Sequence, residues 1–202
     1  MKKHLFLQAP VQAGKSTLLQ EAMEPYREYI GGFVSQRLKD SSLNTIGFRL
    51  ADYSSEPALT AAFTEALSNI FLRHGSDKSS FSLSVFENQA IDILEAAKAS
   101  KQIILLDEIG GGELKSDIFK NYLDRLLMGN VPCIGVLKAP KAAANTGRGI
   151  GTDLKDENAL LHERLDAYNA ELLMYSRDKF YEQKKYIQRF IEEKLCGHFM
   201  TD

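Results

Sequence analysis

The stretch Ala9-Pro-Val-Gln-Ala-Gly-Lys-Ser-Thr17 decides the fold, because it has the form of a phosphate-binding loop. Apolar residues at 5–7 precede it and predict a short buried strand, and a helical pattern follows from Leu18. In this order of strand, loop and helix, successive backbone N–H groups and the positive end of the helix dipole can bind phosphate oxygens. The strict pattern begins with glycine, and Ala9 fits that position if its φ is negative.

Each part of this Walker A loop receives a predicted role. Lys15 is expected to reach the β- and γ-phosphates and to act in catalysis, and the Ser16 hydroxyl to bind Mg²⁺. The predicted nucleotide-binding residues are Ala9, Pro10, Val11, Gln12, Ala13, Gly14, Lys15, Ser16 and Thr17. The alternative is an ordinary turn that contains Gly-Lys-Ser by chance, but the flanking strand and helix favour the phosphate-binding loop.

A second motif, Gln102-Ile-Ile-Leu-Leu-Asp-Glu108, is an aliphatic run that ends in two carboxylates. It suits a strand buried on both faces of a parallel sheet, whose C-terminal edge is where such sheets bind ligands. We expect Asp107 to hold Mg²⁺ and Glu108 to be the general base. Because strand neighbours point to opposite faces, both serve one site only if the backbone bends, and glycines 110–112 would permit this. Without the phosphate-binding loop, a solvated strand end would be the better interpretation.

The acidic motif also carries a family resemblance. Asp107-Glu-Ile-Gly-Gly-Gly-Glu-Leu114, followed by Ser116 and Phe119, resembles the signature D-E-I-G-x-M-E-L-x-S-x-x-F of the cancer-related nucleoside-triphosphatase family, also described as nucleotide-kinase-like. Three further segments, 32–35, 46–48 and 84–87, agree with the family in order and spacing. After about residue 137, fewer residues resemble those of the family. It implies slow, Mg²⁺-dependent hydrolysis of nucleoside triphosphates with broad base tolerance.

The chain also departs from the family pattern. Where the family carries a glutamate and then an arginine after its G-F-x-T strand, this chain has Gln36-Arg37-Leu38-Lys39. Gly112 replaces a methionine of the acidic motif, and Ala9 and Gln12 replace two glycines of the loop. These departures indicate a divergent member, whose activity and substrate can have shifted.

The rest of the chain predicts an α/β architecture of the P-loop NTPase fold, with a mainly parallel sheet flanked by helices. Segments 30–38 and 45–53 are expected to form a β-hairpin after the first helix, because a polar turn joins them. Apolar residues at helical spacing predict a helix over 58–72. The other expected elements are helices at 15–28, 87–99, 116–128 and 177–195 and strands at 102–108, 131–137 and 171–175.

Length and composition predict a single P-loop NTPase domain over residues 1–202. The net charge of -2 offers no basic field for nucleic acid. Cys133 and Cys196 lie too far apart in the sequence to suggest a disulfide or metal framework, and a cytoplasmic location is expected. No segment approaches the ~20 apolar residues of a membrane span. A monomer is favoured, although composition leaves the oligomeric state open.

Several residues retain two interpretations. The stretch 138–156, which contains Lys138, Lys141 and Arg148, is either a lid over the site or a flexible surface excursion. An arginine from a lid could stabilise charge on the transferred phosphoryl group. The four histidines lack metal-ligand spacing and are expected to be surface residues or satisfied core residues.

Three acidic or basic residues near the strand ends are also ambiguous. Arg37 and Lys39 either contact a phosphate or second substrate, or are solvated edge residues. Glu113 either orients a nucleophile or a basic partner, or caps the helix that begins near Lys115.

Three functions fit these motifs. The first is hydrolysis of ATP or GTP with Mg²⁺, in which Glu108 orients water. The second is a kinase that transfers the γ-phosphate to a small-molecule acceptor, held by Arg37, Lys39 and the lid. The third is a nucleotide-controlled binding protein, since Asp107-x-x-Gly110 fits the acidic switch motif of GTPases. The chain contains no N-K-x-D guanine-recognition motif, which disfavours a regulatory GTPase and leaves the base preference open.

Overall fold

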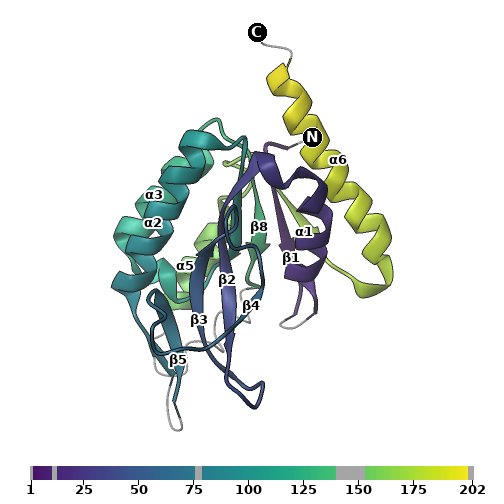
Figure 1. Cartoon of the computed structure of the whole chain (residues 1–202). Helices are drawn as coiled ribbons and strands as arrows, with labels where there is room; N and C mark the ends of the chain where they lie inside the picture. The colour runs from purple at the N-terminus through teal and green to yellow at the C-terminus, as the bar shows by residue number, and fades with distance from the viewer. Residues whose placement is uncertain (1, 11–12, 76–78, 140–152, 200–202) are drawn as a thin grey trace.

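A mixed β-sheet with helices on both faces forms the centre of the computed structural model, which describes residues 2–10, 13–75, 79–139 and 153–199 (Figure 1). In this part of the chain the strand order is β6-β5-β3-β2-β7-β8-β1-β9, and β4 pairs with β2 outside that order. The strands are β1 (His4–Gln8), β2 (Ile30–Lys39), β3 (Thr45–Asp52), β4 (Thr60–Ala62), β5 (Ile70–His74), β6 (Ser79–Phe81), β7 (Ile103–Ile109), β8 (Cys133–Leu137) and β9 (Ala170–Met174). The α-helices are α1 (Lys15–Met23), α2 (Leu83–Ser100), α3 (Asp117–Met128), α5 (Asp153–Glu163) and α6 (Phe180–Phe199).

The sheet is parallel from β2 to β9 and antiparallel beyond β2. Strands β2, β7, β8, β1 and β9 pair in parallel, whereas β2–β3, β3–β5 and β5–β6 are antiparallel. The β2–β3 turn is closed by the Asp40 carboxylate, which accepts hydrogen bonds from the backbone N–H groups of Ser42 and Asn44. This arrangement confirms the predicted α/β fold, with a mainly parallel sheet and a β-hairpin after the first helix.

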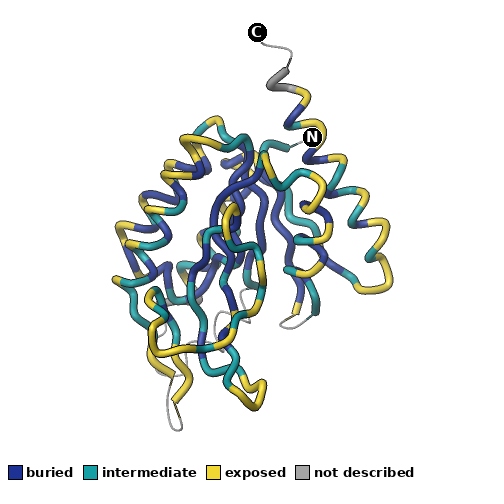
Figure 2. The backbone as a smooth tube through the Cα atoms, viewed as in Figure 1, coloured by how far each residue is buried: buried dark blue, intermediate teal, exposed yellow. Residues whose placement is uncertain are grey.

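Two hydrophobic cores flank the sheet. Helices α1 and α6 pack on one face, and α2 and α3 pack on the other (Figure 1). All five residues of β1 and of β8 are buried, as are most of β7, because helices cover these strands on both sides (Figure 2). Continuous burial explains why the strands before both motifs are uninterrupted apolar runs. Within the described residues, no helix is long and apolar enough to cross a membrane.

The predicted helix over 58–72 is wrong. That segment contains β4, which pairs with β2, and the start of β5, which pairs with β3. Asn69 has a φ of 69°, a left-handed conformation that interrupts a helix immediately before β5. Apolar residues at helical spacing exist here, but strand pairing and the packing of Phe71 against Phe86 outweigh that local signal.

Other boundaries differ for local reasons. The first helix ends at Met23 and a 3-10 helix (Glu24–Tyr29) follows, because Pro25 has no N–H to continue the α-helical ladder. Helix α2 begins at Leu83, before the predicted residue 87. Helix α5 was not predicted at all, and its first residues fall inside the stretch 138–156 that was expected to be a lid or a flexible excursion.

His4 is a satisfied core residue of β1. Its Nδ1 accepts a hydrogen bond of 2.8 Å from the Cys133 backbone N–H, so its Nε2 donates to the Leu127 carbonyl, 2.9 Å away. The ring is fully buried, and burial lowers its pKa to about 4. The neutral imidazole therefore links β1 to β8 and to the end of α3.

We expect His4 to make the protein less stable at acidic pH. Because the folded pKa lies below the unfolded value of about 6.5, the unfolded chain binds this proton first as the pH falls. The contribution of neutral His4 to the free energy of unfolding is fully present above about pH 6.5. It is lost as the pH falls towards 4, by roughly 3 kcal/mol in total. Urea unfolding at pH 7 and pH 4.5 measures it. The His4→Gln variant should lose less stability between these pH values, and equal losses in both proteins would contradict the prediction.

Candidate functional site

The predicted phosphate-binding loop connects the buried strand β1 to α1, so the strand–loop–helix order is the expected one. Gly14 caps the helix with a φ of 102°, a conformation that suits glycine, while Ala9 does not have a positive φ. The Lys15 side chain folds back over the loop, and its Nζ donates hydrogen bonds of 3.1 Å to the carbonyls of Ala9 and Pro10. Val11 and Gln12 lie outside the described residues. The helix N-terminus and the Lys15 ammonium group thus meet at one end of the sheet.

The structure brings the two predicted metal ligands together. The Ser16 hydroxyl, in the first turn of α1, donates a 3.0 Å hydrogen bond to Oδ1 of Asp107 on β7. Burial first, and then the nearby Glu108 carboxylate, raise the pKa of Asp107, while the Ser16 hydroxyl and the charges of Lys15 and Lys138 lower it; together these effects bring it to about 7. A cation at Asp107 would favour the ionised carboxylate in the same way.

Glu108 lies on a bulge in β7. The strand continues to Ile109, but its pairing with β8 shifts between Asp107 and Ile109, so that Glu108 is the additional residue. The backbone bend that both carboxylates require is therefore at Glu108 itself, two residues before the first of the glycines expected to provide it. The Glu108 backbone N–H donates to the Ser35 hydroxyl on β2, 3.2 Å away. Its side chain is partly exposed, as a group that meets a ligand must be.

Glu113 stabilises the turn that follows β7. Its Oε1 accepts hydrogen bonds of 2.6 Å and 2.7 Å from the backbone N–H groups of Gly110 and Gly111, and the residue is buried. The residue that caps α3 is Ser116, whose hydroxyl accepts from the Phe119 N–H. Glu113 is therefore not the cap of that helix. It satisfies two N–H groups that strand pairing cannot reach in this turn.

Lys39 and Arg37 on β2 have different surroundings. The Lys39 Nζ donates hydrogen bonds of 2.9 Å to the Leu43 carbonyl and the Thr45 hydroxyl, and so closes the β2–β3 hairpin. The Arg37 guanidinium lies over the Phe48 ring, 5.8 Å from its centroid. Lys39 thus has a structural role in the hairpin. Arg148, the predicted lid arginine, lies outside the described residues.

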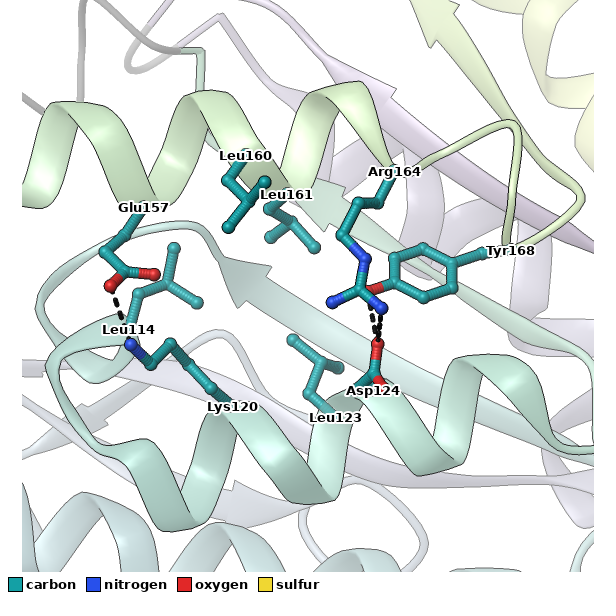
Figure 3. Close-up of a pocket in the computed structure, with 9 residues that line it drawn as sticks. All are labelled: Leu114, Lys120, Leu123, Asp124, Glu157, Leu160, Leu161, Arg164 and Tyr168. Carbon is teal, nitrogen blue, oxygen red and sulfur yellow. Dashed lines mark hydrogen bonds and ion pairs between the residues drawn. The ribbon is translucent and has the colours of Figure 1, made fainter.

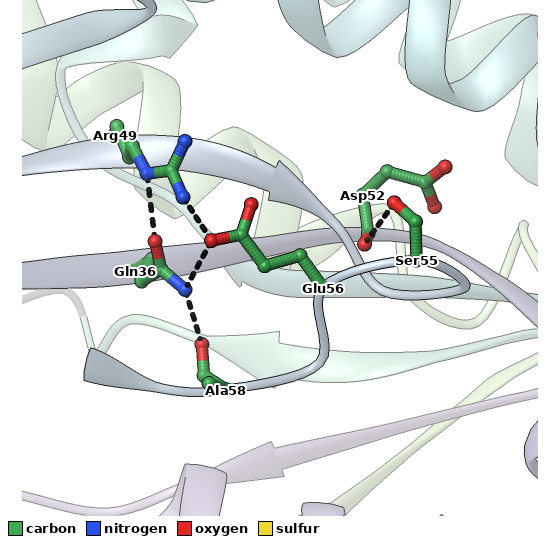
Figure 4. Close-up of polar contacts among 6 residues, drawn as sticks. All are labelled: Gln36, Arg49, Asp52, Ser55, Glu56 and Ala58. Atoms are coloured by element: carbon green, nitrogen blue, oxygen red, sulfur yellow. Dashed lines mark hydrogen bonds and ion pairs between the residues drawn. The ribbon is translucent and has the colours of Figure 1, made fainter. Parts of the chain in front are cut away.

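Gln36 stands where the family pattern has a glutamate, and it is the buried member of a polar network on β2 and β3 (Figure 4). Its amide oxygen accepts from Arg49 Nε at 2.7 Å, and its amide nitrogen donates to the Ala58 carbonyl at 2.9 Å. Arg49 also pairs with the Glu56 carboxylate, which comes from the loop after β3. A carboxylate from a different segment thus lies beside Gln36 and Arg49, and the network holds that loop against β2 and β3.

Sequence reasoning placed Lys138 in the ambiguous stretch 138–156, and it did not assign Asn158 or His162 to the end of β8. Lys138 follows that strand directly, and its backbone N–H donates to the Ile109 carbonyl at 2.9 Å. From α5, the buried Asn158 amide donates to the carbonyls of Gly110 and Lys138, at 2.8 Å and 3.2 Å, and His162 Nε2 to that of Lys138 at 3.0 Å. A basic residue directly after a buried apolar strand was the available signal for Lys138. Nothing local indicated Asn158.

Comparison with known proteins decides the family. A model of the NTPase family matches residues 4–162, well over half of the chain. The chain belongs to the NTPase family. This confirms the resemblance read from the acidic motif, and it makes the protein a hydrolase of the nucleoside-triphosphatase type.

Individual relatives of this NTPase are distant. Nucleoside-triphosphatase THEP1 of Methanocaldococcus jannaschii is 22% identical over 136 residues, which are 66% of this chain and 76% of that protein. The crystal structure of THEP1 from Aquifex aeolicus is 22% identical with a TM-score of 0.61, covering 95% of this chain and 99% of the other. The solution structure of a human cancer-related nucleoside triphosphatase is 20% identical with a TM-score of 0.66, covering 95% and 98%. At these identities the two structures establish the shared fold.

Proposed function

We propose that this NTPase binds a nucleoside triphosphate with Mg²⁺ in the loop 9–17 and hydrolyses it to the diphosphate and phosphate, with broad base tolerance. The observation that carries the proposal is the 3.0 Å hydrogen bond between Ser16 and Asp107. It joins the phosphate-binding loop and the acidic strand, two motifs far apart in the sequence, at the same edge of the sheet.

The residues present fit a magnesium ion. Mg²⁺ prefers oxygen ligands and, in nucleotide sites, uses one or two protein groups with substrate phosphates and water. Ser16 and Asp107 offer a hydroxyl and a carboxylate oxygen already within 3.0 Å of one another. When bound there, the ion would neutralise charge on the β- and γ-phosphates.

The remaining residues have separate roles in hydrolysis. The backbone N–H groups at the start of α1 and the Lys15 ammonium group bind phosphate oxygens, so Lys15 would exchange its bonds to Ala9 and Pro10 for bonds to the substrate. Glu108, on the bulge beside Asp107, orients a water molecule and accepts its proton. Water attacks the γ-phosphorus in line, and the diphosphate leaves.

Broad base tolerance is supported by the part of the nucleotide that the motifs are suited to bind. The proposed binding groups, from the loop and from Asp107, would all bind phosphates or metal, and the sequence lacks the N-K-x-D motif that recognises guanine. Binding that depends on phosphates does not distinguish the four bases.

Phosphate release tests this proposal directly. We expect inorganic phosphate to be released from ATP, GTP, CTP and UTP at rates within about tenfold of each other, with Mg²⁺ present, because phosphate positioning supplies most of the catalysis. The activity should disappear with EDTA and return with added Mg²⁺. Nucleotide binding without phosphate release would instead favour transfer to another acceptor, and undiminished release in EDTA would contradict the metal site.

A further inference from the structure

Lys138 lies in the middle of the sheet edge that carries the proposed site, which we call the catalytic edge; it is formed by the ends of β1, β8 and β7. Val136 of β8 is in register both with Leu7 of β1 and with Asp107 of β7. Lys138 follows two residues later, so it comes between the strand that enters the phosphate-binding loop and the strand that carries Asp107. Residues two apart on an extended chain share a face, and Val136 belongs to the core on the α1 face of the sheet. Lys138 therefore leaves β8 on the side of the proposed phosphate site.

The Lys138 ammonium group lies over the turn after Glu108. A Cβ built on Gly111 would be only 2.6 Å from Lys138 Nζ, which shows how closely the amine approaches this backbone. Among the described residues, no carboxylate forms an ion pair with Lys138 within 4.0 Å. Its charge nevertheless acts on Asp107, as does that of Lys15. Gly111 leaves space for the amine that a larger residue would occupy.

Helix α5 fixes the position of Lys138. Asn158 and His162 both donate to the Lys138 carbonyl, and Asn158 also holds the Gly110 carbonyl. The helix is itself fixed to α3 by the Lys120–Glu157 ion pair, and Arg164, directly after α5, pairs with Asp124 of α3 (Figure 3). The cavity between α3 and α5 measures only about 50 Å³, well below the 300 Å³ or more of usual small-molecule sites. This contact therefore supports the catalytic edge and does not accept a nucleotide.

We propose that Lys138 is a second phosphate-binding lysine of this enzyme, whose ammonium group contacts the γ-phosphate oxygens and stabilises the charge that develops during transfer to water. The inference rests on the proposed hydrolysis at Lys15, Asp107 and Glu108. In that step the water oxygen forms a bond to the γ-phosphorus, and the bond to the bridging oxygen breaks. The bridging oxygen keeps the electron pair, and Glu108 receives the water proton. Lys138 remains protonated throughout and supplies only charge and hydrogen bonds.

The test compares Lys138→Ala with Lys138→Arg and with Lys98→Ala, a matched control on the exposed surface of α2. We expect Lys138→Ala to lower kcat about 50-fold with KM for Mg²⁺–ATP within about threefold, because a donor aimed at developing charge acts chiefly in the transition state. The kcat of Lys138→Arg should be at least about tenfold higher than that of Lys138→Ala, since arginine keeps the positive charge. Lys98→Ala should match the parent enzyme. Binding of ADP with aluminium fluoride should weaken in Lys138→Ala, while binding of a non-hydrolysable ATP analogue is retained.

The outcomes separate the inference from the function on which it rests. If the parent enzyme hydrolyses ATP and Lys138→Ala keeps kcat within threefold, or raises only KM, Lys138 has no role in the transition state. If the parent enzyme releases no phosphate, the proposed function itself fails. Thermal melting of each variant reports the fold. The backbone hydrogen bonds of Lys138 do not depend on its side chain, and Lys138→Gln replaces the alanine variant if that protein does not fold.

Discussion

We expect the Glu108→Gln enzyme to bind Mg²⁺–ATP with the parent affinity and to hydrolyse it about 10² to 10⁴ times more slowly, the usual effect of losing a general base. Glutamine has nearly the size of glutamate but cannot accept the water proton. The backbone N–H bond from residue 108 to Ser35 does not involve the changed atoms, so the bulge should persist. Single-turnover phosphate release measures the rate, and equilibrium titration with a fluorescent nucleotide measures the affinity.

Glu95→Gln on the exposed surface of α2 is the matched control, and it should leave both quantities unchanged. The replacement at 108 also removes a negative charge that raises the pKa of Asp107, so Asp107 should ionise more readily in the variant. Turnover that survives the change would show that another group activates the water, and a parallel loss of nucleotide affinity would make Glu108 a binding residue.

Local patterns were sufficient to locate the two central motifs. The strands before them are apolar throughout because helices cover both faces of β1 and β7, and such runs are visible without knowledge of their partners. The glycine at the start of α1 is equally local, since position 14 needs a positive φ. Because the carboxyl ends of parallel strands lie at the same edge of a sheet, Ser16 and Asp107 come together there. Their proximity could therefore be inferred from the fold class.

What sequence reasoning could not provide depends on distant partners. The bulge at Glu108 is visible only from the shift in pairing between β7 and β8. Strands β4 and β5 exist because β2 and β3 offer them edges, whereas their own residues repeat at helical spacing. Asn158 reaches the site through carbonyls of Gly110 and Lys138, which are 48 and 20 residues away in the chain. Polar side chains that bind backbone carbonyls leave no periodic pattern to detect.

The Lys15→Ala variant should lose tight binding of Mg²⁺–nucleotide, with a dissociation constant raised about 100-fold or more, as expected when one member of a desolvated charge pair is removed. The Lys15 ammonium group is buried and bonds only the two loop carbonyls of Ala9 and Pro10 among the described residues, so no ion pair of the fold is lost with it. The effect on folding should be smaller than the effect on binding. Isothermal titration with Mg²⁺–ADP and Mg²⁺–ATP measures both affinities.

Lys15 and Lys138 should differ in these titrations, because they meet the substrate at different stages. Lys15, at the helix N-terminus, holds phosphates of the ground state, so its loss should weaken binding of both nucleotides. Lys138, beside Gly111 after β8, should affect turnover far more than binding. A third control, Lys101→Ala, removes a lysine that bonds the Glu28 carbonyl away from the site, and should bind normally. Unchanged nucleotide affinity in Lys15→Ala would rule out the loop 9–17 as the phosphate site.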